Sequence, residues 1–414
     1  MVYVINKQGQ ALMPTERFGK VRRLLKNSLA HVVCRIPFTI QLDYDTTDYT
    51  QPVSLGVDAG SKHIGISATT SEKELYAADV ELRNDIVDKL STRREQRRTR
   101  RSRLRYRKAR FNNRVSSKRK GWLAPSVENK IQTHLTVVEK IHKFLPITNI
   151  VVEIASFDIQ KINNPIISGS EYQQGEQLDF FNVREYVLFR DNHTCQHCKG
   201  KSKDKVLNVH HIESRKTGGD SPNNLITLCE TCHKAYHRGE FKLNVKRGKS
   251  FRDSAFMGIM RWSFYDRLKN IYPNVSMTFG YITKNTRITN NLPKEHYVDA
   301  RCISGNPTAK PLGYYFYQKK VRCQNRQIHK ANFLKGGRKK LNQAPFLVKG
   351  FRLFDLVEYQ NDLYYIFGRR DSGFFDIRKL NGTKVNKGSI NCKHLRLIAT
   401  RKSILIEKRM QVNL

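Results

Sequence analysis

Residues 53–70 read VSLGVDAGSKHIGISATT, and this stretch decides the fold of the chain. The apolar run Val53–Val57 predicts a buried strand, and Asp58-Ala59-Gly60 predicts a turn. Ile64–Thr69 then predicts the partner strand of a hairpin. Asp58 therefore stands at the end of a buried strand, where its carboxylate is available for chemistry.

Two later segments supply further acidic side chains. The run Ile150–Glu153 predicts a buried strand that ends on a glutamate. In a helix predicted over residues 294–303, His296 and Asp299 are three residues apart and share one face. The resulting set, here called the acidic centre, consists of Asp58, Glu153, His296 and Asp299. Two-metal phosphodiester cleavage needs carboxylates gathered in this way, to hold two cations about 3.5–4 Å apart.

Residues 183–240 form an insert rich in cysteine and histidine. Cys195-Gln-His-Cys198 and Cys229-Glu-Thr-Cys232 are two Cys-x-x-Cys knuckles with 30 residues between them. Four thiolates paired in this way suit tetrahedral Zn²⁺, and four sulfur ligands leave no open position for water, so the site is predicted to be structural. The other four cysteines are scattered and argue against a disulfide framework: Cys34, Cys302, Cys323 and Cys392.

A second constellation lies beside the knuckles. His210-His211, Asn224 and His233, which directly follows Cys232, resemble the HNH nuclease family in its form with a zinc knuckle. The resemblance implies that His211 is the general base, because a neutral imidazole is available near pH 7. It also implies that His210 and His233 hold a single Mg²⁺ and that Asn224 orients His211 or the scissile region. A zinc-ribbon binding module without catalysis is the plain alternative.

The net charge points to a nucleic-acid partner. The chain has 414 residues, 39% of them hydrophobic, and a formal charge of +40. So many like charges repel one another in a compact state and call for a polyanion. A membrane surface is a weaker candidate because the sequence has no run of about 18 apolar residues, and no signal peptide is visible at the N-terminus.

The basic residues are densest between positions 92 and 120. This stretch holds fifteen Arg or Lys and one acid, Glu95, and it lacks Gly and Pro, so a long helix is predicted. The helix has no apolar stripe to bury, and a nucleic-acid backbone along it would supply the missing counter-charge. A solvated face or a disordered tail is the alternative. The arginines assigned to nucleic-acid binding are Arg93, Arg94, Arg97, Arg98, Arg100, Arg101, Arg103, Arg105, Arg107, Arg110 and Arg114.

Both ends of the chain predict smaller modules. The first 50 residues predict a strand at Val2–Ile5, a basic helix at Arg17–Asn27 and two further strands. The region from residue 306 onward is basic and aromatic. Its segments Leu353–Phe367 and Phe374–Leu380 have β character, and a small barrel is expected there.

The order of these segments is similar to that of the IscB family, the transposon-associated OMEGA nucleases related to the CRISPR type II effectors. Leu12-Met13-Pro14-Thr15 resembles the PLMP module of that family, although Ala11 stands where the first Pro would be. The resemblance divides the chain into a PLMP-like module (1–50), RuvC segment I (51–91), an arginine-rich bridge helix (92–120), RuvC segment II (121–182), an HNH nuclease with zinc knuckles (183–245), RuvC segment III (246–305) and a C-terminal region that contacts RNA and the target-adjacent motif (306–414).

The resemblance implies an α/β multidomain fold: a split RuvC-like RNase H fold with an inserted ββα-metal HNH domain and a β-rich C-terminal domain. A long structured guide RNA, the omega-RNA, would pair with target DNA, and protein would read a short adjacent motif on the duplex. The HNH centre would cut the guide-paired strand by one-metal hydrolysis. The RuvC centre would cut the displaced strand by two-metal hydrolysis with Mg²⁺. A monomeric ribonucleoprotein in the prokaryotic cytoplasm, held at the nucleoid by DNA, is expected.

Three alternatives remain at this stage. An unguided HNH DNA endonuclease explains the insert, but it does not explain the acidic centre or the arginine run. A catalytically silent RNA- or DNA-binding protein would require decayed catalytic positions, and none is visible. An actin-like ATPase built around Asp58 would need a second phosphate-binding loop, which the sequence lacks, and the charge is wrong for it.

Arg369, Arg370 and Arg378 are candidates for reading bases by residue type alone.

Overall fold

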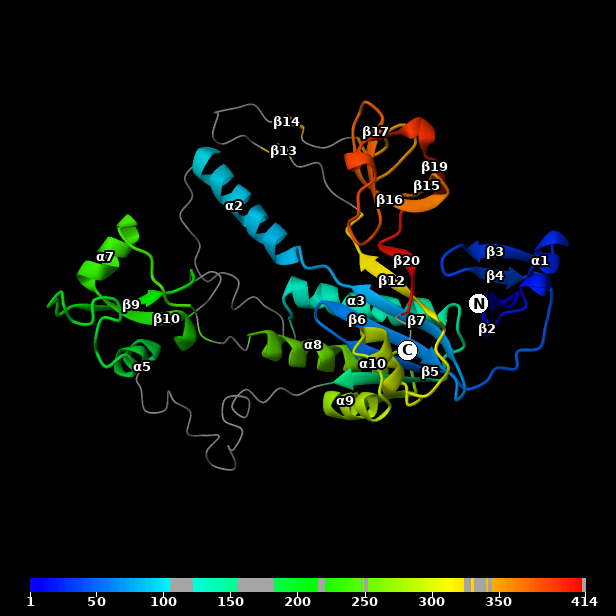
Figure 1. The fold of residues 1–414 in the computed structure, drawn as a ribbon, viewed down its shortest axis with the longest axis horizontal. Helices are drawn as coiled ribbons and strands as arrows, with labels where there is room; N and C mark the ends of the chain where they lie inside the picture. The colour runs from blue at the N-terminus through cyan, green and yellow to red at the C-terminus, as the bar shows by residue number, and fades with distance from the viewer. Residues whose placement is uncertain are drawn as a thin grey trace. The chain divides into compact units, whose positions relative to one another are not determined.

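The chain folds into two compact units. The computed structural model describes residues 1–104, 122–154, 182–214, 220–246, 248, 252–323, 329–330, 340–341 and 345–411. The core unit consists of Met1–Ala155 and Ile259–Leu414, and the inserted unit consists of Ser156–Gly258 (Figure 1). Among the described residues, no helix is both long enough and apolar enough to cross a membrane.

A seven-stranded mixed sheet forms the centre of the core unit. Its strands lie in the order β11-β8-β5-β6-β7-β12-β20. Their bounds are β5 Ser54–Ala59, β6 His63–Thr69, β7 Glu74–Glu81, β8 Asn149–Ile154, β11 Val275–Phe279, β12 Tyr314–Lys320 and β20 Ile404–Met410. The predicted hairpin is confirmed, since β5 and β6 pair antiparallel. The turn predicted at Asp58-Ala59-Gly60 begins later than expected, because β5 continues through Asp58 and Ala59.

Strand β5 is buried on both faces, which explains why its sequence is nearly all apolar. Leu55, Val57 and Ala59 are fully buried on one face, and alternation along a strand puts Gly56 and Asp58 on the other. Strand β8 pairs with β5 in parallel, with Val57 opposite Val152. The two carboxyl-terminal strand ends therefore lie side by side.

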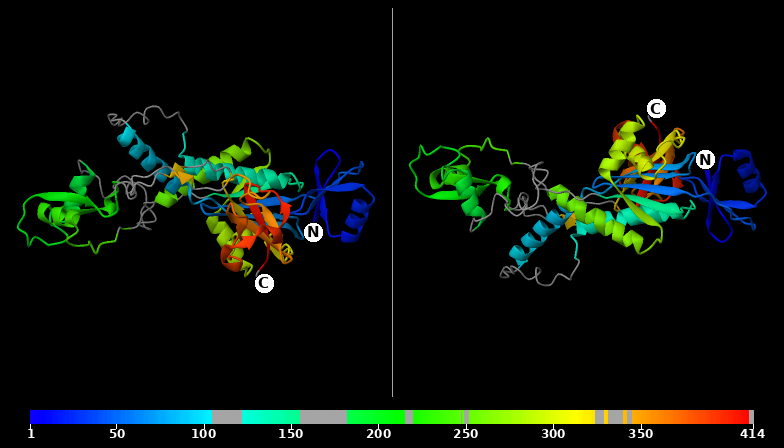
Figure 2. Two further views of the ribbon diagram at one scale, coloured as in Figure 1. Left: turned by 90° about the horizontal axis from the view of Figure 1, so that it is seen from above. Right: turned by 90° about the horizontal axis from the view of Figure 1, so that it is seen from below.

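Helices cover both faces of the sheet (Figure 2). Helix α10, His296–Ile303, lies against β5 and β6, where glycines allow a close approach. A Cβ atom added at Gly56 would meet the Ala300 carbonyl oxygen at 1.9 Å, and one at Gly65 would meet the carbonyl oxygen of His296 at 1.9 Å. Any side chain at these two glycines would push α10 away from the sheet.

Two further helices pack together in the core unit. They are α3, Pro125–His142, and α8, Arg252–Lys269, through which the chain returns from the inserted unit. Arg267 of α8 donates to both carboxylate oxygens of Glu128 in α3, at 2.6 and 2.9 Å. The amphipathic pattern of residues 127–145 predicts α3, and the helix ends before Pro146 as expected.

The N-terminal module is a four-stranded sheet with one helix. Its strands lie in the order β2-β1-β4-β3. The bounds are β1 Val2–Ile5, β2 Ala11–Thr15, α1 Phe18–Lys26, β3 Ala30–Cys34 and β4 Thr39–Leu42. The sequence predicts every element except β2, which carries the PLMP-like residues. The Tyr3 hydroxyl donates to the carbonyl of Leu75 at 2.9 Å and joins the module to the central sheet.

The C-terminal region is divided between two sheets. A five-stranded antiparallel sheet has the order β18-β17-β16-β15-β19, and its strands are β15 Leu356–Tyr359, β16 Asp362–Arg369, β17 Phe374–Arg378, β18 Ile390–Asn391 and β19 Arg396–Ala399. The segment Leu353–Phe367, expected to have β character, lies largely in the hairpin of β15 and β16, which turns at Gln360 and Asn361, both with positive φ. Strands β12 and β20 come from the same region of the sequence but complete the central sheet.

The inserted unit is built on one short hairpin. Strands β9, Leu207–His211, and β10, Leu225–Cys229, pair antiparallel, and helices α5, Val183–Arg190, and α7, Glu230–Arg238, flank them.

The remaining described elements are α2 Ile86–Leu104, α9 Gly280–Thr289, η2 Pro222–Asn224, β13 His329–Lys330, β14 Lys340–Leu341, η4 Asn386–Gly388 and η5 Cys392–His394. The predicted arginine-rich helix therefore begins earlier, at Ile86, and residues 105–120 lie outside the described residues.

Substitution at Gly56 tests the packing of α10. We expect Gly56→Ala to destabilise the protein by about 2 kcal/mol or more, because the methyl group has no space beside the Ala300 carbonyl. Gly19→Ala is the matched control, since a Cβ atom added at Gly19 in helix α1 would have nothing within 4 Å, and this variant should be neutral or slightly stabilising. Denaturant unfolding measures both, and equal stability of the two variants would contradict the packing argument.

Candidate metal centres

The acidic centre forms where two parallel strands end. Asp58 lies near the end of β5 and Glu153 near the end of β8, one position beyond the paired Val57 and Val152. Both carboxylates are buried, with residue exposures of 8% and 9%. Burial disfavours a charged carboxylate, and it is the largest cause of the raised pKa of Glu153, followed by the charge of Asp58.

Helix α10 brings the other two residues of the centre to the same place. The His296 Nδ1 atom lies 2.8 Å from the Oδ2 atom of Asp58, and this hydrogen bond raises the pKa of His296. The pKa of Asp299 is raised by burial and then by the charge of Asp58. The structure thus places the four predicted residues close to one another, and the three carboxylates supply the oxygen donors that a hard divalent cation prefers.

Two arginines that the sequence analysis does not identify face these carboxylates. Arg261 of α8 places Nη2 3.2 Å from Glu153 Oε1 and 3.9 Å from Asp58 Oδ1. Arg287 of α9 has its Nε atom 3.0 Å from Asp299 Oδ1, without hydrogen-bond geometry. Neither arginine could be found from the sequence, because both stand among many other basic residues and are far from the carboxylates along the chain.

His63 extends the acidic centre beyond the four predicted residues. Its ring stacks on the ring of His296, with centroids 5.2 Å apart and planes within 3°. Its Nδ1 atom lies 2.8 Å from Asp79 Oδ1, which holds the His63 ring in turn. The stack restricts the orientation of the His296 ring, so His63 is a positioning residue.

The four knuckle cysteines come together in the inserted unit. The sulfur atoms of Cys195, Cys198, Cys229 and Cys232 all lie within 4.8 Å of one another, a donor set that could hold zinc. They pack into a small apolar core with Ile226 and Leu228. The knuckles therefore supply part of the core of the inserted unit.

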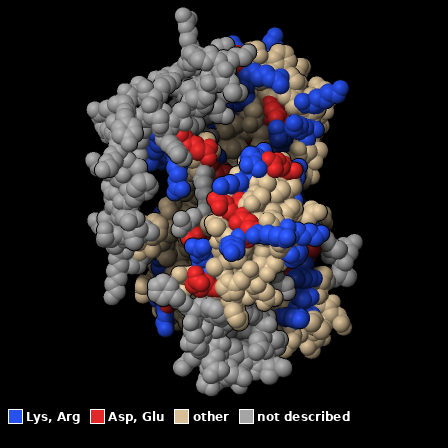
Figure 3. All heavy atoms as spheres, turned by 90° about the vertical axis from the view of Figure 1, so that its left-hand side faces the viewer, with Lys and Arg blue, Asp and Glu red and all other residues tan. Residues whose placement is uncertain are grey.

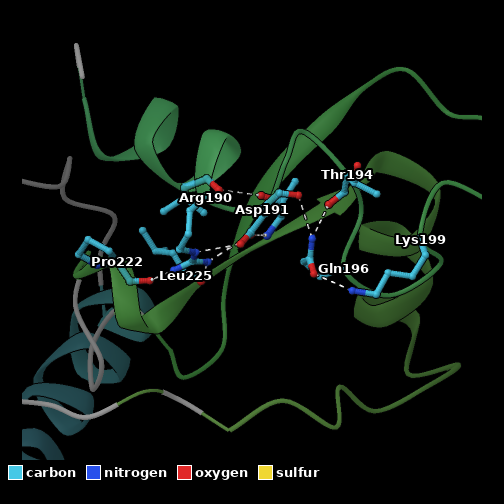
Figure 4. Close-up of polar contacts among 9 residues, drawn as sticks. Arg190, Asp191, Thr194, Gln196, Lys199, Pro222 and Leu225 are labelled. Atoms are coloured by element: carbon cyan, nitrogen blue, oxygen red, sulfur yellow. Dashed lines mark hydrogen bonds and ion pairs between the residues drawn. The ribbon is translucent and has the colours of Figure 1, made fainter. Parts of the chain in front are cut away.

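A polar network ties the first knuckle to the hairpin (Figure 4). The Arg190 guanidinium at the end of α5 donates to the carbonyl oxygens of Pro222 and Leu225, each at 2.8 Å. Gln196, within the knuckle, donates from Nε2 to the carbonyl of Asp191 at 3.0 Å. These contacts fix the segment between Pro222 and Leu225, which carries Asn224.

Three histidines form a second group of possible metal ligands, here called the histidine centre. The ring nitrogens of His210, His233 and His237 lie within 4.8 Å of one another. The Nε2 atom of His210 is buried and has no hydrogen-bond partner in the structure. Burial and, after it, the charge of His233 lower the pKa of His210 to about 4, so the imidazole is neutral and can bind a cation. The sequence analysis assigns no role to His237, although its i, i+4 spacing from His233 on α7 is a usable signal.

His211 and Asn224 lie next to this centre. The Nε2 atom of His211 lies 2.9 Å from Oδ1 of Asp220, a carboxylate that orients the ring. Asn224 is fully buried; its Oδ1 accepts from the Glu213 backbone N–H at 2.9 Å and its Nδ2 donates to the Glu213 carbonyl at 3.0 Å. Asn224 therefore fixes the backbone two residues beyond His211, which is how it can position that side chain.

The arginines assigned to nucleic-acid binding are described only in part. Arg93, Arg94 and Arg97 lie exposed on α2. Arg98, Arg100, Arg101 and Arg103 belong to the same helix, and Arg105, Arg107, Arg110 and Arg114 lie outside the described residues. Lysine and arginine side chains are also spread over the described part of the face in Figure 3.

The C-terminal arginines differ in their surroundings. Arg378 is paired with Asp376, and Arg370 donates to the Ser389 hydroxyl at 2.8 Å. Burial and then the neighbouring Arg401 lower the pKa of Arg369, and its guanidinium donates to the carbonyl of Phe346.

A cavity of about 600 Å³ lies apart from both centres. It is bordered by apolar and aromatic residues such as Phe18 and Tyr314, with Arg22, Arg35 and Lys408 among them. The described residues that border it include no carboxylate side chain and no imidazole. We therefore assign the chemistry to the two centres, whose donor atoms are placed for it, and not to this cavity.

Two family models match the chain. Residues 2–175 match a model described as RRXRR protein, and residues 195–239 match one described as HNH endonuclease. The inserted unit therefore carries an HNH endonuclease domain. Together, the RRXRR and HNH matches support the predicted resemblance to HNH nucleases of the IscB and Cas9-like type. HNH nucleases are metal dependent, which agrees with the histidine centre.

The matches to individual proteins cover only part of this chain and only part of each matched protein. Anaredoxin from Nostoc sp. (strain PCC 7120) is 42% identical over 41 residues, which are 10% of this chain and 54% of that protein. Cas9 of Streptococcus thermophilus in complex with the AGAA PAM has 14% identity and a TM-score of 0.34, over 50% of this chain and 30% of Cas9. The Type II-C Cas9 of Actinomyces naeslundii has 10% identity and a TM-score of 0.25, over 62% of this chain and 60% of that Cas9. This chain thus spans about half of the matched curated relative and less than a third of the first Cas9.

Loss of one knuckle cysteine should release the zinc. We expect Cys195→Ser to lower bound zinc from about one ion per chain to well below that, and to unfold the inserted unit, because metal binding and folding are coupled. Zinc content by mass spectrometry and the rate of proteolysis within residues 182–246 measure the two effects. Cys323→Ser, outside the cluster, is the matched control and should keep both. A zinc-free Cys195→Ser protein with an intact inserted unit would contradict a structural role for the metal.

Proposed function

We propose that the protein is an RNA-guided endonuclease that cuts both strands of double-stranded DNA. The single observation that carries the proposal is the presence of two separate candidate centres, the acidic centre in the core unit and the histidine centre in the inserted unit, on a chain with a charge of +40. A single-strand or unguided nuclease needs one such centre. Two centres on one chain fit two strands that are held apart, as they are when RNA displaces one of them.

In the inserted unit, His211 is the general base that removes a proton from the attacking water. Asp220 holds its ring, and Asn224 holds the backbone beyond it, so Nδ1 is left to face the reacting groups. His210, His233 and His237 would hold one divalent cation, which would stabilise the charge on the leaving oxygen. Three imidazoles suit a transition metal better than Mg²⁺, so the expected magnesium is assigned more firmly to the other centre.

In the core unit, the acidic centre is a RuvC-type site in a split RNase H fold. Asp58, Glu153 and Asp299 would supply the oxygen ligands and His296 a nitrogen for two Mg²⁺ ions, which would activate water and stabilise the leaving group. His296 is already hydrogen-bonded to Asp58 and stacked on His63, so its ring is preorganised. We assign the displaced strand to this centre and the guide-paired strand to the inserted unit.

RNA is the proposed permanent partner. Helix α2 begins a run with fifteen basic residues and one acid between positions 92 and 120, and it would serve as the bridge helix along the guide backbone. The guide would be a structured RNA of the omega type, encoded beside a transposon. The N-terminal module and the C-terminal sheet would contact RNA and the duplex beside the target. We place the monomeric complex in the cytoplasm of a prokaryote, bound to the nucleoid.

An unguided HNH DNA endonuclease is the second candidate. It is favoured by one observation: the inserted unit contains its own hairpin, zinc-type cluster and histidine centre and forms a compact unit by itself. It leaves the acidic centre and the charge of α2 without a role.

Bound RNA is the first test of the guided function. We expect protein purified from cells that carry its native locus to contain one dominant structured RNA with one variable end, because the charge of the chain requires a polyanion. Sequencing of the bound nucleic acid measures this. An active nuclease that is free of RNA would contradict the proposal and favour the unguided endonuclease.

Single substitutions should separate the two centres. His211→Ala should leave nicking of the displaced strand alone, and Asp58→Ala should leave nicking of the guide-paired strand alone. Each substitution should slow cleavage of the strand that its centre cuts by about a hundredfold or more, because it removes a general base or a metal ligand. Strand-specific labels on a guided duplex measure the two rates. Identical nicking patterns in both variants would show that the assignment of strands is wrong.

A further inference from the structure

We propose that Arg261 is a built-in counter-ion of the acidic centre, and that it sets the concentration of divalent metal at which this centre fills. The inference rests on the proposed metal-binding role of the centre and adds a residue to it. Arg261 lies on α8, the helix through which the chain returns from the inserted unit to the core unit.

The guanidinium of Arg261 is fixed in place. Its Nε atom donates to the carbonyl of Ala59 at 2.6 Å, directly beyond Asp58 on β5. Its Nη2 atom is 3.2 Å from Glu153 Oε1 and 3.9 Å from Asp58 Oδ1. Arg261 itself is buried, with 8% exposure. A buried group that is anchored on the backbone keeps its charge at one position, unlike a surface side chain.

The position of this charge has two opposite consequences. Asp58 and Glu153 are buried side by side, and such a pair is costly without a positive charge between them. Arg261 supplies that charge and so stabilises the fold before metal binds. A cation that binds the same two carboxylates must share their oxygens with Nη2 and is repelled by it. Arg261 should therefore both stabilise the metal-free centre and weaken its affinity for metal.

Arg267 provides a matched comparison on the same helix. It lies six residues further along α8 and makes its ion pair with Glu128 of α3, through both guanidinium Nη atoms. Loss of Arg267 removes a partly exposed ion pair between helices without changing the charge beside Asp58. A variant at Arg267 therefore reports what the loss of an α8 arginine does by itself.

The first measurement is binding of Mn²⁺ to the full-length chain. Electron paramagnetic resonance of the free ion gives the amount that is not bound. All variants carry His233→Ala and His237→Ala, so that the histidine centre does not contribute, and all are matched in bound nucleic acid. We expect Arg261→Met to lower the Mn²⁺ dissociation constant at least about tenfold, since it removes a unit charge that lies 3.2 Å from Glu153 and 3.9 Å from Asp58. Arg261→Lys, which keeps the charge, and Arg267→Met should both stay close to the parent.

The second measurement is the melting temperature with and without saturating Mn²⁺. Arg261→Met should melt lower than the parent without Mn²⁺ and should gain more than the parent when Mn²⁺ is added, because the ion replaces the missing charge. Arg267→Met should lose the same amount in both conditions. An equal loss for Arg261→Met in both conditions would mean a structural role only and would overturn the inference.

The outcomes also separate this inference from the proposed function. In one outcome, the parent binds Mn²⁺ more tightly than its Asp58→Asn variant, but Arg261→Met binds no better than the parent. This outcome overturns the role of Arg261 and leaves the metal centre in place. A parent that binds Mn²⁺ no better than Asp58→Asn overturns the metal centre, and the role of Arg261 falls with it. If Arg261→Met does not fold, Arg261→Gln replaces it in both measurements.

Discussion

The close contact between α10 and strands β5 and β6 is the constraint on which the core unit depends. Gly56 and Gly65 leave no room for a Cβ atom beneath the carbonyls of Ala300 and His296. Because the helix lies so near the sheet, His296 reaches Asp58 with a hydrogen bond of 2.8 Å. A larger residue at either glycine would separate a helix-borne ligand from a strand-borne one, so two small residues control the geometry of the whole acidic centre.

Charge compensation is the second theme of the structure. The core unit buries carboxylates at one end of its sheet and holds them there with the fixed guanidinium groups of Arg261 and Arg287. The inserted unit differs, because the possible metal ligands that it gathers are imidazoles and thiols and not carboxylates. The two units therefore prepare for metal with different chemistry, oxygen donors in one and nitrogen or sulfur donors in the other, and the preferred metals should differ accordingly.

Local sequence patterns predict most of the elements near the sites. The β5–β6 hairpin, the strand that carries Glu153, the helix that begins at His296 and the two cysteine knuckles are all recognisable, because each depends on spacing within a few residues. The boundaries that fail are informative. The sequence predicts a turn at Asp58, but β5 continues through it because Asp58 and Ala59 still pair with Gly65 and Ile64 of β6. The segment Leu353–Phe367 has the expected β character, but its turn was not predicted, since Gln360 and Asn361 adopt positive φ without the glycine that usually marks such a turn.

The sequence by itself determined the ligand types, the place of the cysteine- and histidine-rich insert and the net charge of +40, since these follow from composition and short-range spacing. Only the tertiary structure decided which distant groups face one another. It added His237 to His210 and His233, placed Arg261 between two carboxylates, and moved β12 and β20 from the C-terminal region into the central sheet. The physical reason is that a buried contact between segments hundreds of residues apart depends on how sheets and helices pack, and that packing leaves no periodic signal in the chain.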